Sequence, residues 1–113
     1  MMRDPLIKAY GHVYPADAAL EEALRAALAD ALPDTDDIPL LERDGDMLRI
    51  SFEGSYFPED EAVAALRTAA GMPQGKLDVL DLENWRMTRH AFRDGVLHSS
   101  AAPLNNVLDY SGH

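Results

Sequence analysis

The sequence contains no cysteine. This absence excludes disulfide bonds, thiolate nucleophiles, zinc ribbons and iron–sulfur clusters, and it fits a reducing compartment. No apolar run approaches the length of about 18 residues that a membrane span needs. The first eight residues, MMRDPLIK, also lack the apolar segment of a signal peptide. We therefore expect a cytoplasmic protein that does not bind a membrane.

Basic residues are scarce. The chain of 113 residues has 20 Asp and Glu against 10 Lys and Arg, which gives a net charge of −10. Its length predicts a single domain over residues 1–113, and an apolar content of 47% is ordinary for a globular protein. A chain of this charge repels phosphate backbones, so we expect no nucleic-acid partner.

The excess of acid is concentrated in the middle of the chain. Residues 35–61 carry two basic and nine acidic side chains. We predict that this region binds a partner protein with a basic face, because opposite charge speeds and orients association. The alternative is a solvated surface that only keeps the protein soluble. The predicted partner-binding residues are Asp36, Asp37, Glu59, Asp60 and Glu61.

Motifs for catalysis and for phosphate binding are missing. No Gly-x-Ser-x-Gly sequence occurs, and the glycines form no phosphate-binding loop. No His-Glu-x-x-His or other ligand motif of fixed spacing is present. We therefore predict no catalytic residues, no cofactor and no metal, and a protein that is not an enzyme is the favoured interpretation.

Two helices are predicted from apolar residues at helical spacing. The first begins at Pro15, has Asp17 near its N-terminus and ends near Leu32-Pro33, and the second begins at Pro58. Both prolines are placed at the first helical position, where no backbone donor is needed.

Alternating apolar residues predict strands around these helices. Arg43-Asp44-Gly45 and Arg93-Asp94-Gly95 are each interpreted as a three-residue hairpin loop, the first of which would put Ile38 on the same face as Leu48. The predicted order is β-α-β-β-α-β-β. We expect an α+β fold, a ferredoxin-like βαββαβ sandwich with an extra C-terminal hairpin strand and a short docked tail. That fold occurs with many unrelated functions, so it predicts none.

A second candidate site lies in the second hairpin. The assumed three-residue loop places His90 opposite His98, about 5 Å away, where two imidazoles could share a cation; two half-exposed histidines are the alternative. The predicted ligand-binding residues are Trp85, Arg86, Arg89, His90 and His98, with Asp81 or Glu83 as an acid–base partner. A set of charges that merely balance a sheet edge is the other interpretation.

Three classes of function remain open. The favoured one is a non-catalytic interaction module: an accessory, regulatory, inhibitor or immunity-type protein. The second is a small enzyme or ligand-binding domain with the site around Trp85. The third is a structural subunit whose open sheet edge pairs in a homodimer or a larger assembly. The C-terminal stretch 104–113 is expected to pack on its own domain, and insertion into a partner is the alternative.

Overall fold

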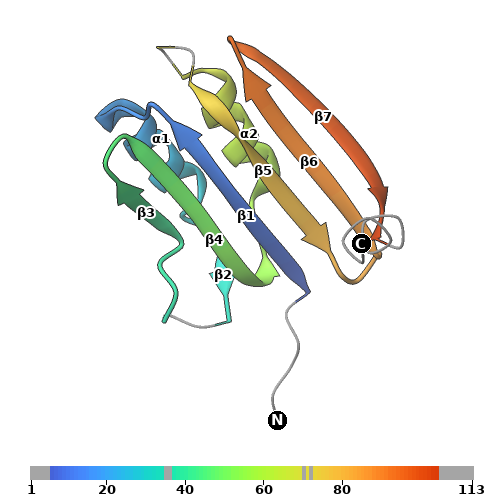
Figure 1. Ribbon diagram of the computed structural model, residues 1–113. Coiled ribbons are helices and arrows are strands. Elements are labelled where there is room, and N and C mark those ends of the chain that lie inside the picture. The colour runs from blue at the N-terminus through green and yellow to red at the C-terminus, as the bar shows by residue number, and fades with distance from the viewer. Residues whose placement is uncertain (1–5, 35–36, 70, 72, 105–113) are drawn as a thin grey trace.

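The computed structural model describes residues 6–34, 37–69, 71 and 73–104. Two helices and seven strands follow one another along this part of the chain (Figure 1). Their bounds are β1 Ile7–Tyr14, α1 Ala18–Ala27, β2 Leu32–Pro33, β3 Leu41–Asp44, β4 Met47–Tyr56, α2 Glu59–Arg67, β5 Gln74–Asp81, β6 Arg86–Arg93 and β7 Val96–Pro103.

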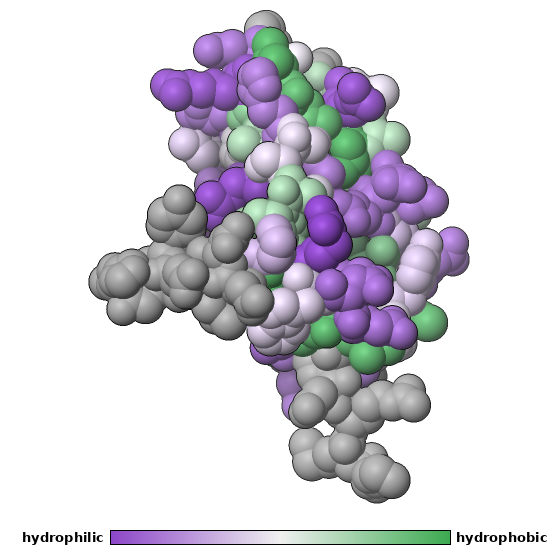
Figure 2. Space-filling view, turned by 90° about the vertical axis from the view of Figure 1, so that its right-hand side faces the viewer, coloured by the Kyte–Doolittle hydropathy of each residue, from purple (hydrophilic) through white to green (hydrophobic). Residues whose placement is uncertain are grey.

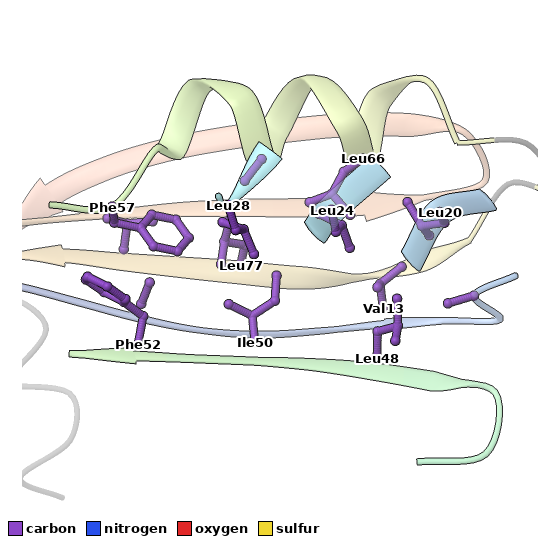
Figure 3. Packing of buried hydrophobic residues seen from close by; sticks show 14 of the residues in the cluster. Val13, Leu20, Leu24, Leu28, Leu48, Ile50, Phe52, Phe57, Leu66 and Leu77 are labelled. Carbon is purple, nitrogen blue, oxygen red and sulfur yellow. The ribbon is translucent and has the colours of Figure 1, made fainter. Parts of the chain in front are cut away.

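The seven strands form one antiparallel sheet in the order β2-β4-β1-β5-β6-β7, with β3 also paired to β4. Strands β2 and β3 therefore share one edge of β4. Both helices cover the same face of the sheet, and the other face is left open (Figures 1 and 3). These findings confirm the predicted α+β class, although seven strands are more than a βαββαβ unit contains.

Alternation along β4 shows why the sheet has one apolar face. Leu48, Ile50 and Phe52 are buried beneath the helices, whereas Arg49 and the residues that alternate with it point to the open face. Leu24 of α1 is fully buried against this face (Figure 3). Successive strand residues point to opposite sides, so the sequence of β4 determines which side the helices cover.

Helix α1 begins three residues later than predicted. Its N-cap is Asp17, whose carboxylate accepts a hydrogen bond from the Leu20 amide at 2.8 Å. Pro15 precedes the helix and follows a cis peptide bond. An aspartate side chain at the N-cap satisfies an amide that the first turn leaves unpaired, which favours the start at Ala18.

The end of α1 was also predicted wrongly. The helix stops at Ala27, and Leu32-Pro33 forms the short strand β2, paired with Tyr56 and Gly54 of β4. Gly54 permits this pairing, because a Cβ at that position would lie 2.2 Å from the Leu32 carbonyl oxygen. The second helix was predicted within one residue: α2 begins at Glu59, and Pro58 occupies its N-cap.

Both hairpin loops have two residues, not the predicted three. The β3–β4 loop is Gly45-Asp46, with φ +61° at Gly45, so Leu41 pairs with Ile50. Ile38 lies before β3 and is 46% exposed, which contradicts its predicted place beside Leu48. A glycine of positive φ at the first loop position matches the twist of the strands.

The β6–β7 loop is Asp94-Gly95, with φ +54° and +79°. Positive φ at both positions is typical of the type I′ turn, for which Asp-Gly is a preferred sequence. The strands therefore pair Arg93 with Val96, and His90 lies opposite Ser99 instead of His98. A shift of one residue moves a side chain to the other face, so this correction changes the candidate site.

Candidate functional site

The first turn of α2 carries three consecutive carboxylates, Glu59, Asp60 and Glu61. Negative charge is stabilising here because the helix N-terminus carries partial positive charge. Asp60 and Glu61 are exposed, whereas Glu59 is partly buried and points toward β6. Two of these carboxylates are therefore open to a partner, and the third has a partner within the protein.

Other carboxylates lie at the same end of the sheet. The Asp34 amide donates to the Glu53 carbonyl oxygen at 2.9 Å, which places the segment after β2 beside the end of β4, where α2 begins. Asp37 follows in that segment. In the register of the sheet, Ile7 of β1 is level with both Gly54 of β4 and Asp81 of β5. We call this group the acidic end. Its members after β2 and in the β5–β6 turn lie toward the bottom of Figure 1, and α2 lies above them. It comprises Asp34, Asp37, Glu59, Asp60, Glu61, Asp81 and Glu83.

Four of the five predicted partner-binding residues belong to the acidic end. Glu59, Asp60 and Glu61 are adjacent on α2, and Asp37 lies between β2 and β3. Asp36 lies outside the described residues. Asp60 and Glu61 are exposed neighbours on α2, and the function of these carboxylates as a binding surface stays a prediction.

A buried histidine links α2 to the β6–β7 hairpin. His90 is 7% exposed, and its two ring nitrogens are both within hydrogen-bonding distance of a side chain. Nε2 is 2.6 Å from Oε2 of Glu59, and Nδ1 is 2.7 Å from Oγ of Ser99. In the tautomer whose Nε2–H donates to the Glu59 carboxylate, Nδ1 accepts a hydrogen bond from the Ser99 hydroxyl.

The Ser99–His90–Glu59 arrangement differs from that of serine hydrolases. In those enzymes the serine contacts Nε2 and the acid contacts Nδ1, whereas here the two nitrogens are exchanged. The contacts satisfy both nitrogens of a buried ring and connect three elements. We therefore interpret the network as a structural link. A two-residue interpretation of Asp94-Gly95 would have predicted the His90–Ser99 pair from the sequence.

The five predicted ligand-binding residues do not form one site. Trp85 lies in the β5–β6 turn with φ +57°, and its carbonyl oxygen accepts from the Leu104 amide at 3.0 Å. Arg86 is the first residue of β6, at the same end. His90 points under the helices, whereas Arg89 and His98 belong to the open face.

The predicted placement of His90 opposite His98 is therefore wrong, and the two side chains, which lie on opposite faces of the sheet, could not share a cation. Within the described ranges, no group of three or more His, Asp or Glu side chains could hold a metal ion.

Asp81, predicted as an acid–base partner, caps the β5–β6 turn. Its Oδ1 accepts from the amides of Glu83 and Asn84 at 3.1 and 3.0 Å, and its Oδ2 accepts from the Asn84 side chain at 2.8 Å. Chiefly the bond from the Asn84 side chain, helped by the two amides, lowers the pKa of Asp81 against an opposing effect of burial. The carboxylate thus has a clear role in holding the turn.

The open face gathers polar and charged side chains from six strands, β1 and β3 to β7. Asp78 of β5 accepts two hydrogen bonds from the Arg89 guanidinium of β6, at 2.8 and 3.0 Å, and this pair raises the pKa of Arg89. The Tyr10 hydroxyl donates to Glu53 at 2.6 Å. Partial burial, followed by this carboxylate, raises the pKa of Tyr10 to about 12.

The chain matches no known protein family, and no similar curated protein or solved structure was found. In the part of the chain that the structure describes, no helix has the length and apolar character needed to cross a membrane.

Proposed function

We propose that this protein is a small, non-catalytic interaction module whose acidic end binds a basic surface of a partner protein. The observation that carries the proposal is the run of three carboxylates in the first turn of α2, two of them exposed, with further carboxylates in the segment after β2 and in the β5–β6 turn. With a net charge of −10, the field of the whole chain would also attract a basic partner.

Asp60 and Glu61 are the two residues best suited to this contact. Both residues are exposed and lie on a rigid helix. Neither side chain forms a hydrogen bond or ion pair within the described residues. Glu59 supports them indirectly, because its bond to His90 ties the first turn of α2 to β6. A charged side chain without a partner inside the protein can pair across an interface without first breaking an internal bond.

The accessory, regulatory, inhibitor and immunity-type roles all use such a surface, and the proposal does not choose among them. A structural subunit and a small enzyme stay alternative predictions, as does the cytoplasmic location.

We also infer that β1, α1, β3, β4, α2 and β5 form a ferredoxin-like unit to which β6 and β7 add an extension. The strand order β3-β4-β1-β5 and the position of both helices on one face support this inference. In such a fold the first turn of the second helix and the end of the strand before it lie at one end of the sheet.

The test is co-purification from the native host with tagged wild type and two double variants, followed by quantitative mass spectrometry. Asp60→Lys/Glu61→Lys changes the acidic end without touching Glu59. Glu22→Lys/Asp44→Lys makes the same change of charge at exposed positions near the other end of the sheet. Each preparation is compared at about 50 mM and about 300 mM NaCl, because salt screens charge pairing.

We expect a Lys- and Arg-rich protein to be retained by the wild type and by Glu22→Lys/Asp44→Lys. It should be lost from Asp60→Lys/Glu61→Lys and weakened by the higher salt. Equal retention by both variants would refute the proposed surface. Failure of the wild type to retain any basic protein at low salt would refute the proposed function.

A further inference from the structure

A shallow hollow lies on the open face of the sheet, near the β6–β7 loop. Its lining includes His12 and Tyr14 of β1, Lys76 of β5, Ala91 and Arg93 of β6, and His98 of β7. No Asp or Glu is among the described residues that line it, although the chain has 20 of them. The hollow is therefore a basic site in an acidic protein.

The sheet register explains both the shape and the charge of the hollow. Across neighbouring strands, His12 pairs with Lys76, Lys76 with Ala91, and Ala91 with His98. Strands are about 4.8 Å apart, so the backbones of Lys76 and His98 are roughly 10 Å apart. Ala91 has no side-chain atom beyond Cβ and lies between the longer side chains of Lys76 and His98. The surface of the sheet is therefore lower at Ala91.

Several donors around the hollow are available to a ligand. Neither the Arg93 nor the His98 side chain forms a hydrogen bond or ion pair with another described residue. The Lys76 ammonium has only Asp78 nearby, at 4.0 Å, and that carboxylate is already held by the two bonds from Arg89. An anion in the hollow would thus meet cationic groups that do not have to break strong internal pairs.

We propose that this hollow binds the phosphate group of a small phosphomonoester. A phosphate has three acceptor oxygens and close to two negative charges, so it suits donors that converge from Lys76, Arg93 and His98 on three strands. The rings of His12 and Tyr14 stack with their centroids 6.0 Å apart at one side of the hollow. They offer a flat surface for a planar organic group such as a nucleobase.

The negative net charge does not exclude such a site. Glu59 bonds His90, the neighbour of Ala91, but on the helix-covered face of the sheet. The row of His12 is five residues along β1 from Ile7, which is level with Asp81 at the β5–β6 turn. At about 3.4 Å per residue this separation is roughly 17 Å, about twice the screening length of about 8 Å at physiological salt. The nearby cations therefore dominate the potential in the hollow.

The test is an NMR titration of the labelled protein with inorganic phosphate, AMP and adenosine at constant ionic strength. Ala91→Leu fills the hollow without changing charge, and Arg93→Gln/His98→Gln replaces the guanidinium and the imidazole by neutral amides. Lys8→Gln is the control, because it removes a positive charge from the same face outside the hollow. Each variant is first checked for a native amide spectrum.

We expect saturable shifts with phosphate and with AMP at residues around Ala91, and much weaker binding of adenosine, which has only the base to place on His12 and Tyr14. Ala91→Leu and Arg93→Gln/His98→Gln should each weaken binding by about tenfold or more, the effect of a lost charged hydrogen bond, and Lys8→Gln by less than about twofold. No saturation with either phosphate compound would overturn the proposal, and so would a loss in Lys8→Gln equal to that in the double variant. Far tighter binding of single-stranded oligothymidylate than of AMP would replace it with a nucleic-acid site.

Discussion

The helix-covered side of the sheet has two different halves. Beneath the helices, β1, β4 and β5 present buried aliphatic and aromatic side chains, including Val13, Phe52 and Leu77. On the same side of β6 and β7, Phe92 and Leu97 alternate with His90 and other polar or small residues. The central strands are thus held by apolar packing, whereas the β6–β7 hairpin depends more on polar contacts.

The position of α2 accounts for the difference. A cleft lies between this helix and the β6–β7 hairpin, lined in part by Leu66, Phe92 and Leu97. The view onto the β7 edge shows apolar residues in a broken band between hydrophilic ones (Figure 2). Because α2 does not cover the β6–β7 hairpin fully, specific hydrogen bonds hold the hairpin more than the burial of apolar surface does. The two halves should therefore respond differently to the loss of a single side chain.

The largest effect is expected from Phe52→Ala in the central half. Phe52 is 2% exposed and contacts Phe57, with ring centroids 5.2 Å apart. Its truncation should lower the free energy of unfolding by about 3–5 kcal/mol, measured by urea denaturation. Phe92→Ala, beside the cleft, should cost less because part of its surroundings is already open. Equal losses in the two variants would remove the distinction between the halves.

The next effect is expected from Glu59→Ala, which breaks the link between α2 and the hairpin. His90 would keep a buried Nε2 without its carboxylate, at a cost of about 2 kcal/mol. Amide hydrogen exchange should accelerate in β6 and β7 more than in β1 and β4. Glu61→Ala is the matched control, because it removes a carboxylate from the same helical turn at an exposed position. A uniform change along all strands would argue against a local role for Glu59.

A smaller effect is expected from Asp81→Ala, which removes the cap of the β5–β6 turn. We expect a loss of about 1 kcal/mol at neutral pH. The pKa of Asp81 is lowered in the folded state, so its contribution is present above the ordinary pKa near 4 and is lost as the pH falls. The difference between wild type and variant should therefore shrink in acid. Glu83→Ala in the same turn is the control, and a difference that persisted unchanged in acid would contradict the assignment.

The same contrast explains which parts of the fold could be predicted from the sequence. Periodic apolar residues in α1 and β4 mark one buried face, and both elements were predicted. The hairpin registers were predicted wrongly because an Asp-Gly pair fits loops of two and of three residues, and only the backbone shows positive φ at both Asp94 and Gly95. Strand β2 was missed because two residues carry no alternation.

The candidate sites, too, could be predicted only where their residues are neighbours in the sequence. The acidic end was predicted in part, because Glu59, Asp60 and Glu61 are neighbours in the sequence as well as in space. The basic hollow was missed, because its lining comes from four strands and is recognisable only once their pairing is known. Arg89 and His98 both line the hollow, but the predicted ligand-binding set combined them with His90 of the other face and with Trp85 and Arg86 at the β5–β6 turn.

The smallest effect concerns Tyr10, on the open face of a central strand, and it has the opposite dependence on pH. Burial and the bond to Glu53 raise the pKa of its phenol to about 12. A raised pKa favours the neutral form in the folded state, so this contribution is present below the ordinary value near 10 and is lost as the pH rises toward 12. Tyr10→Phe should cost only about 0.5 kcal/mol at neutral pH. In an ultraviolet titration, the variant should lack the phenol that ionises last, and Tyr14→Phe, the control, should keep it. If Tyr10 instead ionised with the other tyrosines, its bond to Glu53 would not form in solution. The central strands would then lack this alkaline transition.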